Sequence, residues 1–255
     1  MVSSCYFNKG NFAPSQQDAL ALEIVSMGRR EAALLVVCDG IGGLQEGEYA
    51  SSYVSMRVRD WFYGSYLKHI KRCHGWRRIE RDCTGMLYDC NRYLMGYGKE
   101  RGIRLGTTVT MVLLSGRHPF WCCPFFGSVK YLLFHAGDSR GYLVGGRGGR
   151  RCRRLTTDDS LGNHVLCRCI GSFSWQGVEK RRGFLRHGEK LLLCSDGFWR
   201  HLEKEEMAVS FGRKRGVWSS GSMSEEQLER RLVKLGDMGR KRGEKDNQAA
   251  VIAGG

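Results

Sequence analysis

Apolar residues gather in short runs bounded by glycine or by charged residues, a pattern that predicts buried strands. The runs at residues 33–38, 191–194 and 249–253 are almost purely aliphatic. The segment at 107–114 is rich in β-branched residues, which favour extended backbone. Further strands are expected at residues 18–25, 128–135 and 140–144.

A helical period replaces this pattern in four segments. Residues 46–63 carry a broad apolar face, and residues 76–97 repeat apolar side chains near every 3.6 positions. A short helix is expected at 203–209. Ser224 and Gln227 have the spacing of a capping box ahead of three leucines at helical spacing, which predicts the start of another helix.

The order of these elements is strands, two long helices, strands, helices and a last strand. Segregated runs of this kind favour an α+β fold in layers over strict β–α–β alternation. A chain of 255 residues can bury one full core, so we expect a single domain spanning residues 1–255. The irregular sequence at 155–190 is the best candidate for a flap inserted into that domain.

Composition changes this picture little, but it excludes some classes of protein. Hydrophobic residues make up 42% and charged residues 26%, as in ordinary globular proteins. No apolar run approaches the roughly 20 residues that a membrane helix needs, and the N-terminus lacks the pattern of a signal peptide. We therefore expect a cytoplasmic protein without a membrane partner.

The formal net charge is +15, and much of it is clustered, for example at residues 147–154 and 180–186. Such clusters can attract nucleic acid, acidic membranes or phosphorylated partners, or can be solvated loops. Basic residues do not interleave with aromatic ones, and no zinc-finger or RRM signature is present, so nucleic acid is not the expected main partner.

The 11 cysteines include no pair at the CxxC spacing typical of zinc sites, so structural zinc is not expected. Cys38 and Cys194 end apolar runs, where a free thiol behaves as a small hydrophobic side chain. Reduced thiols are the expectation for a cytosolic protein.

Five aspartates lie at the borders of expected strands, and they carry the candidate chemistry: Asp18, Asp39, Asp138, Asp196 and Asp246. A carboxylate is costly to bury unless a cation compensates it. Oxygen ligands select Mg²⁺ or Mn²⁺, and the glycines at 40, 42 and 43 would let backbone approach ions and phosphate. The alternative is that these aspartates are turn residues and strand caps.

Seven motifs in order resemble the metal-dependent protein serine/threonine phosphatases of type 2C (PPM), in their compact bacterial form. The most diagnostic is VCDGIGG at 37–43, followed by GEYAS at 47–51. The others are SQQDA at 15–19, GTTV at 106–109, GDSRGYL at 137–143, LTTDDSL at 155–161, LLCSDG at 192–197 and KDN at 245–247. The resemblance covers about residues 11–253.

The resemblance implies a four-layer fold, in which two antiparallel sheets form a β-sandwich flanked by helices, with two Mn²⁺ or Mg²⁺ ions between the sheets. It implies that Asp39 bridges both ions, that the Gly40 carbonyl binds one of them, and that Asp196 and Asp246 complete the first metal's protein ligands. Asp18 matches the first motif's aspartate, and Asp138 would serve a third, weaker metal position. Asp39 and Asp196 are the expected catalytic residues, because water bridging the ions would attack phosphorus directly.

The implied function is hydrolysis of phosphoserine and phosphothreonine in proteins, opposing a serine/threonine kinase. Its implied partners are phosphorylated proteins, including a Ser/Thr kinase and the substrates of that kinase. Among other candidates, His135 is expected to be a packed residue rather than an acid catalyst, and Arg140 a structural ion-pair partner. Ser195 lacks the context of a nucleophile.

Three positions depart from the family pattern. The family usually has a phosphate-binding arginine at the position of Ala13, and the nearest upstream cation is Lys9. Ile41 stands where many eukaryotic relatives have histidine, and Gln17 replaces a frequent glutamate. Losing the arginine should weaken phosphate binding more than metal binding, so the alternative is a pseudophosphatase that acts as a regulatory phosphoprotein-binding module.

Overall fold

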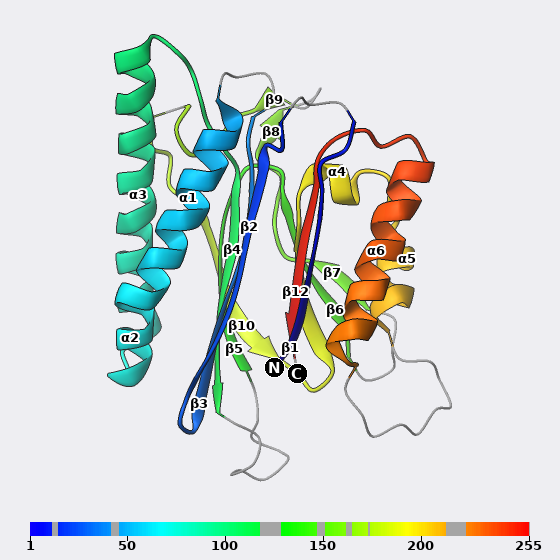
Figure 1. The fold of residues 1–255 in the computed structure, drawn as a ribbon. Helices are drawn as coiled ribbons and strands as arrows, with labels where there is room; N and C mark the ends of the chain where they lie inside the picture. The colour runs from blue at the N-terminus through cyan, green and yellow to red at the C-terminus, as the bar shows by residue number, and fades with distance from the viewer. Residues whose placement is uncertain are drawn as a thin grey trace.

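The computed structural model describes residues 1–11, 15–41, 46–117, 129–146, 151–161, 165–172, 174–212 and 223–254. Two antiparallel sheets of five strands face each other, and helices cover both outer faces, so that the molecule has four layers (Figure 1). The order β10-β5-β4-β3-β2 defines one sheet, here the β3 sheet, and β1-β12-β11-β6-β7 defines the other, the β12 sheet.

The β3 sheet consists of β10 (Glu179–Leu185), β5 (Val129–Ala136), β4 (Val109–Arg117), β3 (Arg30–Asp39) and β2 (Asp18–Met27). The β12 sheet consists of β1 (Val2–Asn8), β12 (Gln248–Gly254), β11 (Glu189–Cys194), β6 (Arg140–Gly145) and β7 (Cys152–Arg154). A separate hairpin pairs β8 (Ser160–Leu161) with β9 (Val165–Leu166).

The helices divide between the two outer faces (Figure 1). Those on the β3 sheet are α1 (Gly47–Trp61), the π-helical turn η1 (Phe62–Tyr66), α2 (Leu67–Lys71) and α3 (Trp76–Arg101). Those on the β12 side are α4 (Asp196–Trp199), α5 (Lys204–Phe211) and α6 (Glu225–Lys241). Within the described residues, no helix is long and apolar enough to span a membrane.

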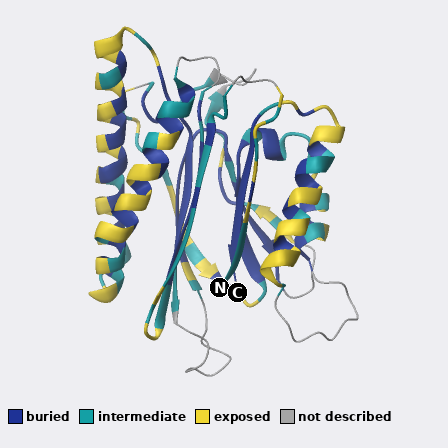
Figure 2. Ribbon diagram, viewed as in Figure 1, coloured by how far each residue is buried: buried dark blue, intermediate teal, exposed yellow. Residues whose placement is uncertain are grey.

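Strand β3 shows why the layers hold together, because its alternate side chains belong to two different cores. Leu34 and Val36 pack with α1 and α3, whereas Leu35 and Val37 pack between the two sheets. A third core lies between the β12 sheet and helices α5 and α6. Three cores therefore fill the spaces between the four layers, and the strands of both sheets are largely buried (Figure 2).

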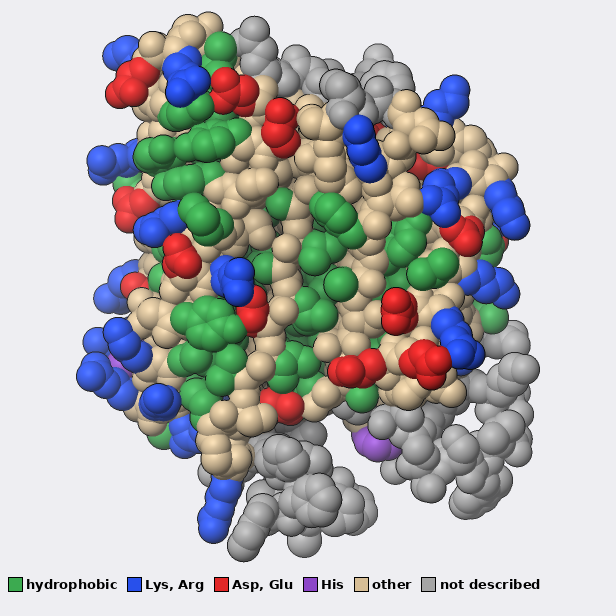
Figure 3. Space-filling view, viewed as in Figure 1, with side chains coloured by type: hydrophobic (Ala, Val, Ile, Leu, Met, Phe, Trp, Pro, Cys, Tyr) green, Lys and Arg blue, Asp and Glu red, His purple; other side chains and the backbone are tan. Residues whose placement is uncertain are grey.

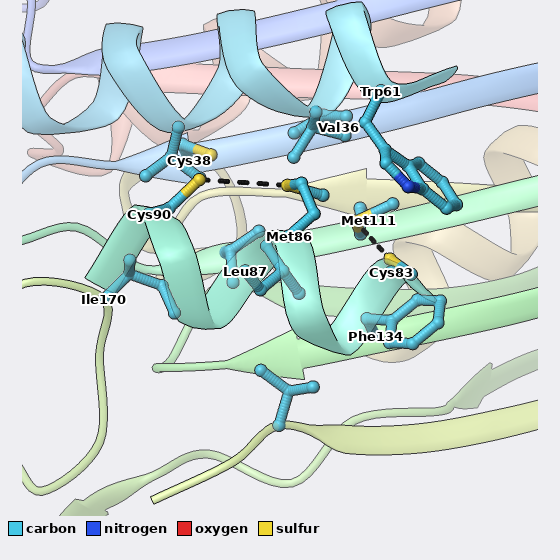
Figure 4. Close-up of a cluster of buried hydrophobic side chains, with 14 of the residues drawn as sticks. Val36, Cys38, Trp61, Cys83, Met86, Leu87, Cys90, Met111, Phe134 and Ile170 are labelled. Carbon is cyan, nitrogen blue, oxygen red and sulfur yellow. Dashed lines mark hydrogen bonds between the residues drawn. The ribbon is translucent and has the colours of Figure 1, made fainter. Parts of the chain in front are cut away.

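The outer core of the β3 sheet is rich in sulfur (Figure 4). The thiol of Cys83 lies 3.9 Å from the Met111 sulfur, and that of Cys90 lies 3.8 Å from the Met86 sulfur. Cys38 and Cys194 are buried and free, which confirms their expected role as small hydrophobic side chains.

The expected strands and helices are all present, with shifted ends. Ser224 caps α6 by accepting a hydrogen bond from the Gln227 amide at 3.2 Å, so the capping box is confirmed. The first long helix continues past residue 63 through the turn η1 into α2. Strands β1 and β7 were not predicted, because β1 is placed by pairing with β12 at the other end of the chain and β7 is a three-residue strand, CRR, without an apolar run.

The expectation that residues 155–190 are irregular is wrong for their second half. Strand β10 pairs along its whole length with β5, from Glu179 opposite His135 to Leu185 opposite Val129. The sequence of β10 is EKRRGFL, which lacks the apolar pattern by which the other strands were predicted. Charged residues are tolerated here because β10 is an edge strand with exposed side chains. A flap remains a prediction for the part of residues 155–190 that precedes β10.

Candidate metal centre

Five separate chain segments bring the five aspartates to one end of the two sheets. In the β3 sheet, Asp18 begins β2 and Asp39 ends β3, and the two residues are direct cross-strand partners. On the β12 side, Asp196 begins α4 directly after β11, and Asp246 lies just before β12. Asp138 occupies the turn between β5 and β6, where the chain passes from one sheet to the other.

Three of these carboxyl groups form a compact cluster. Asp39, Asp138 and Asp196 each place one oxygen within 4.8 Å of the others. Asp18 adjoins the cluster, because Ser195 donates a hydrogen bond from its hydroxyl to Asp18 Oδ2 at 2.7 Å. This bond also ties the β12 side of the site to the β3 sheet.

Two threonines fix the backbone at the end of β3. The Asp39 amide donates to Thr108 Oγ1 at 2.9 Å, and the Asp39 carbonyl accepts from the Thr107 hydroxyl at 3.0 Å. Gly40 follows, and a Cβ there would lie 2.4 Å from the carbonyl oxygen of Gly47. The close approach of helix α1 therefore requires glycine at position 40.

The carboxyl groups of the cluster are buried, and burial disfavours their charged form. Burial raises the pKa of Asp18 to about 8, although the hydrogen bond from Ser195 lowers it, and the charges of Asp196 and Asp246 raise it further. Burial first, and then the Asp196 charge, raises the pKa of Asp138 to about 7. The pKa of Asp39 is also raised well above its usual range, mainly by burial and by Asp18. A bound cation would remove this conflict.

The donor set fits a hard divalent cation. All candidate side-chain donors are carboxylate oxygens, which Mg²⁺ and Mn²⁺ prefer. Those of Asp39, Asp138 and Asp196 lie within 4.8 Å of one another, so carboxylates from three segments can converge on one ion.

A basic residue that the sequence analysis missed lies in this acidic site. Arg200 forms an ion pair with Asp196 four residues earlier, and Arg200 Nη1 lies 3.8 Å from Asp246 Oδ2. The same nitrogen lies 3.7 Å from Glu244 Oε2, and the Glu244 residue is buried. The helical spacing of Asp196 and Arg200 was the available signal in the sequence; nothing there pointed to Glu244 or to the bond from Ser195.

The other sequence candidates have structural partners. Buried His135 hydrogen-bonds through Nδ1 to the Thr110 hydroxyl at 2.9 Å and donates from Nε2 to the Thr157 carbonyl at 2.9 Å. Burial lowers its pKa, so it is a neutral packed residue, as expected. Arg140 pairs with Asp158 at 2.7 Å, which confirms the expected ion pair.

The departures from the family pattern are only partly visible. Ala13, Gly42 and Gly43 lie outside the described residues. Gln17 is held at the site by its backbone, since its amide donates to Asn247 Oδ1 at 2.7 Å and its carbonyl accepts from the Gly40 amide at 3.0 Å. The Ile41 amide donates to the Gly106 carbonyl at 3.0 Å. Lys9 is exposed.

Comparison with solved structures identifies the fold. The serine/threonine phosphatase Stp1 from Staphylococcus aureus matches with a TM-score of 0.77 and 20% identity, over 99% of this chain and 94% of that chain. The S. agalactiae serine/threonine phosphatase matches with a TM-score of 0.70 and 20% identity, over 98% of each chain. The catalytic domain of the serine/threonine protein phosphatase PstP, in complex with two manganese ions, matches with a TM-score of 0.65 and 21% identity, over 98% of this chain and 96% of that chain.

The chain therefore has the fold of bacterial serine/threonine phosphatases, and the expected α+β architecture is confirmed. The family resemblance of the sequence motifs is confirmed at the level of the fold. No protein-family model matches the sequence, and no curated protein matches it.

Proposed function

We propose that this protein is a metal-dependent protein serine/threonine phosphatase of the type 2C (PPM) family. The observation that carries the proposal is the cluster of Asp39, Asp138 and Asp196, three residues from separate segments whose carboxyl oxygens converge within 4.8 Å. It lies at the end of a sandwich that matches phosphatases over almost the whole chain.

The family motifs assign roles to the residues of the cluster. Asp39, the Gly40 carbonyl, Asp196 and Asp246 would hold two Mg²⁺ or Mn²⁺ ions, and Asp138 would hold a third, weaker one. When bound, such ions supply an activated water and neutralise the charge that develops on the phosphoryl group. Asp39 and Asp196 are therefore the proposed catalytic residues.

The remaining contacts keep these donors in place. Thr107 and Thr108 hold the backbone of Asp39, so that its carboxylate projects from a fixed strand end. Ser195 orients Asp18 through its hydroxyl. Fixed donors favour catalysis because the site does not have to reorganise when substrate binds.

The proposed substrates are phosphoserine and phosphothreonine proteins, and the proposed partner is a serine/threonine kinase whose action the enzyme reverses in the cytoplasm. The charge of +15 would favour acidic phosphorylated segments. If so, raising salt should increase KM for a phosphopeptide and leave kcat nearly flat.

Hydrolysis of a phosphothreonine peptide by the purified protein tests the proposal. We expect turnover with Mn²⁺ or Mg²⁺ and none in EDTA. Turnover that is equal in EDTA would contradict a metal-dependent enzyme. A matched assay with a phosphotyrosine peptide tests the substrate class, and it should show slower turnover.

A non-catalytic phosphoprotein-binding module is the second candidate. Ala13 at the phosphate-binding position favours it, as does the neutralisation of Asp196 by Arg200. This candidate predicts that a folded, metal-binding protein retains phosphopeptide without hydrolysing it.

A further inference from the structure

Arg200 connects three acidic residues on the β12 side of the metal centre. It follows helix α4, where its Nη2 donates to Asp196 Oδ2, and its Nη1 faces Glu244 at 3.7 Å and Asp246 at 3.8 Å. One guanidinium thus compensates two of the proposed metal ligands and a buried glutamate.

The guanidinium is held by charge more than by a complete set of hydrogen bonds. Arg200 Nε is buried without a hydrogen-bond partner among the described residues, and so is Glu244 Oε2. Burial opposes the charge of Arg200, but the carboxylates of Asp196, Glu244 and Asp246 raise its pKa above the usual value. A buried donor without a partner has a free-energy cost. The contacts of Arg200 can therefore be replaced by a more favourable interaction of the same carboxylates, such as binding of a metal ion.

The other members of the cluster lack such a partner. Among the described residues, no ion pair involves Asp18, Asp39 or Asp138. A divalent cation would therefore meet carboxylates without an ion-pair partner at Asp18 and Asp39, whereas the Arg200 charge already lowers the pKa of Asp138. On the side of Asp196 it would meet a resident positive charge, which repels it.

We propose that Arg200 is an internal counter-cation that competes with divalent metal for Asp196 and Asp246. The inference rests on the proposed function, because it takes the carboxylate cluster to be a metal site. The side of Asp18 and Asp39 would load first, and full loading would require the guanidinium to move away from Asp196. Arg200 would thus stabilise the metal-free protein and raise the metal concentration needed to fill the site.

Direct measurement of Mn²⁺ binding by calorimetry tests this competition without reference to activity. Arg200→Gln keeps the size of the side chain and removes the charge, so we expect it to bind Mn²⁺ at least about tenfold more tightly than wild type. Arg200→Lys keeps the charge but loses the planar fork, and should lie between the two. If Arg200→Gln folds poorly without metal, Mn²⁺ binding can still be measured with Arg200→Lys.

Arg242→Gln is the matched control. Arg242 binds Glu206 at 2.5 Å and the His201 carbonyl at 2.8 Å, and neither group is a proposed ligand. Its removal changes the net charge equally but should alter Mn²⁺ affinity by less than about twofold, since an exposed charge is screened.

Melting temperatures separate competition from a purely structural role. In EDTA, Arg200→Gln should melt below wild type, and saturating Mn²⁺ should bring the two together. Equal or weaker Mn²⁺ binding by Arg200→Gln, with normal binding by wild type, would overturn the competition and leave the proposed function intact. No Mn²⁺ binding by either protein would overturn both.

Discussion

The two sides of the acidic cluster differ in how their charge is compensated. On the β3 side, the Asp18 carboxylate accepts a hydrogen bond from the neutral hydroxyl of Ser195, and the threonines at 107 and 108 bond only the backbone of Asp39. On the β12 side, Asp196 and Asp246 share the guanidinium of Arg200. Among the described residues, the carboxylates of the β3 side therefore have no ion-pair partner, whereas those of the β12 side have a cation in the chain itself.

The charged side chains of the surface differ from those of the acidic cluster in their exposure to solvent. Charged side chains are distributed over the outer helices (Figure 3), where ion pairs such as Arg230 with Glu226 are exposed to solvent. Exposed pairs of this kind contribute little to stability. The ion pairs of Arg200 at the candidate metal centre are partly buried. Substituting their residues should therefore change the free energy of unfolding more than substituting an exposed pair.

Asp39→Asn should have the largest effect. It removes a proposed catalytic ligand, so we expect phosphopeptide turnover to fall by about 10³-fold or more. The metal-free protein should nevertheless gain about 1 kcal/mol in free energy of unfolding, because one crowded carboxylate is gone. Turnover in EDTA-free Mn²⁺ buffer and urea unfolding in EDTA measure the two effects; near wild-type turnover would contradict the assignment.

Asp196→Asn tests the difference between the two sides, because it should abolish turnover equally but stabilise the metal-free protein less than Asp39→Asn. Burial keeps the pKa of Asp196 raised although Arg200 lowers it, so loss of this charge also relieves a conflict. The same substitution removes an ion-pair partner of Arg200, which offsets that relief. We therefore expect an unfolding free energy about 1 kcal/mol below that of Asp39→Asn, measured by urea unfolding in EDTA. Equal unfolding free energies for the two variants would contradict a difference between the two sides.

The pH dependence of stability should also depend on metal. The folded pKa is raised to about 8 for Asp18 and to about 7 for Asp138, above the value of an unfolded aspartate. The folded state therefore binds more protons, so the metal-free protein should lose stability as the pH rises from about 4 to about 8. Melting temperatures in EDTA across this range measure the loss, and saturating Mn²⁺ should flatten the curve. A metal-free protein that became more stable over this range would contradict the raised pKa values.

Ser195→Ala should have the smallest effect of these variants on metal binding, although Ser195 joins the two sides. The substitution removes the hydroxyl that donates to Asp18 and accepts from the Ala249 amide at 2.9 Å. We expect a loss of about 1–2 kcal/mol in unfolding free energy, with Mn²⁺ binding retained. Ser3→Ala, on the edge strand β1, is the control and should change stability by less than about 0.5 kcal/mol.

The sequence predicted most of the fold because its strands are apolar runs and its helices have clear periods. It did not predict β1, which pairs with β12 at the other end of the chain, or β10, whose edge position allows the charged residues Lys180–Arg182 to face solvent. These strands are defined by distant partners, which a local pattern does not contain.

The site shows the same limit. The five aspartates could be found because each borders an apolar run and matches a motif. The roles of Arg200 and Glu244 depend on the packing of α4 against the segment before β12, where a Cβ at Gly197 would lie 2.2 Å from the carbonyl oxygen of Asn247. Contacts of this kind become visible only when the two segments are placed together.

Anomalous scattering from a crystal of the protein grown with Mn²⁺ would show whether the acidic cluster binds metal. We expect strong manganese peaks between Asp39, Asp138 and Asp196, with the Arg200 guanidinium turned away from Asp196 at full occupancy. Crystals that show the four side chains ordered at saturating Mn²⁺, but no manganese peak among them, would contradict metal binding by the cluster.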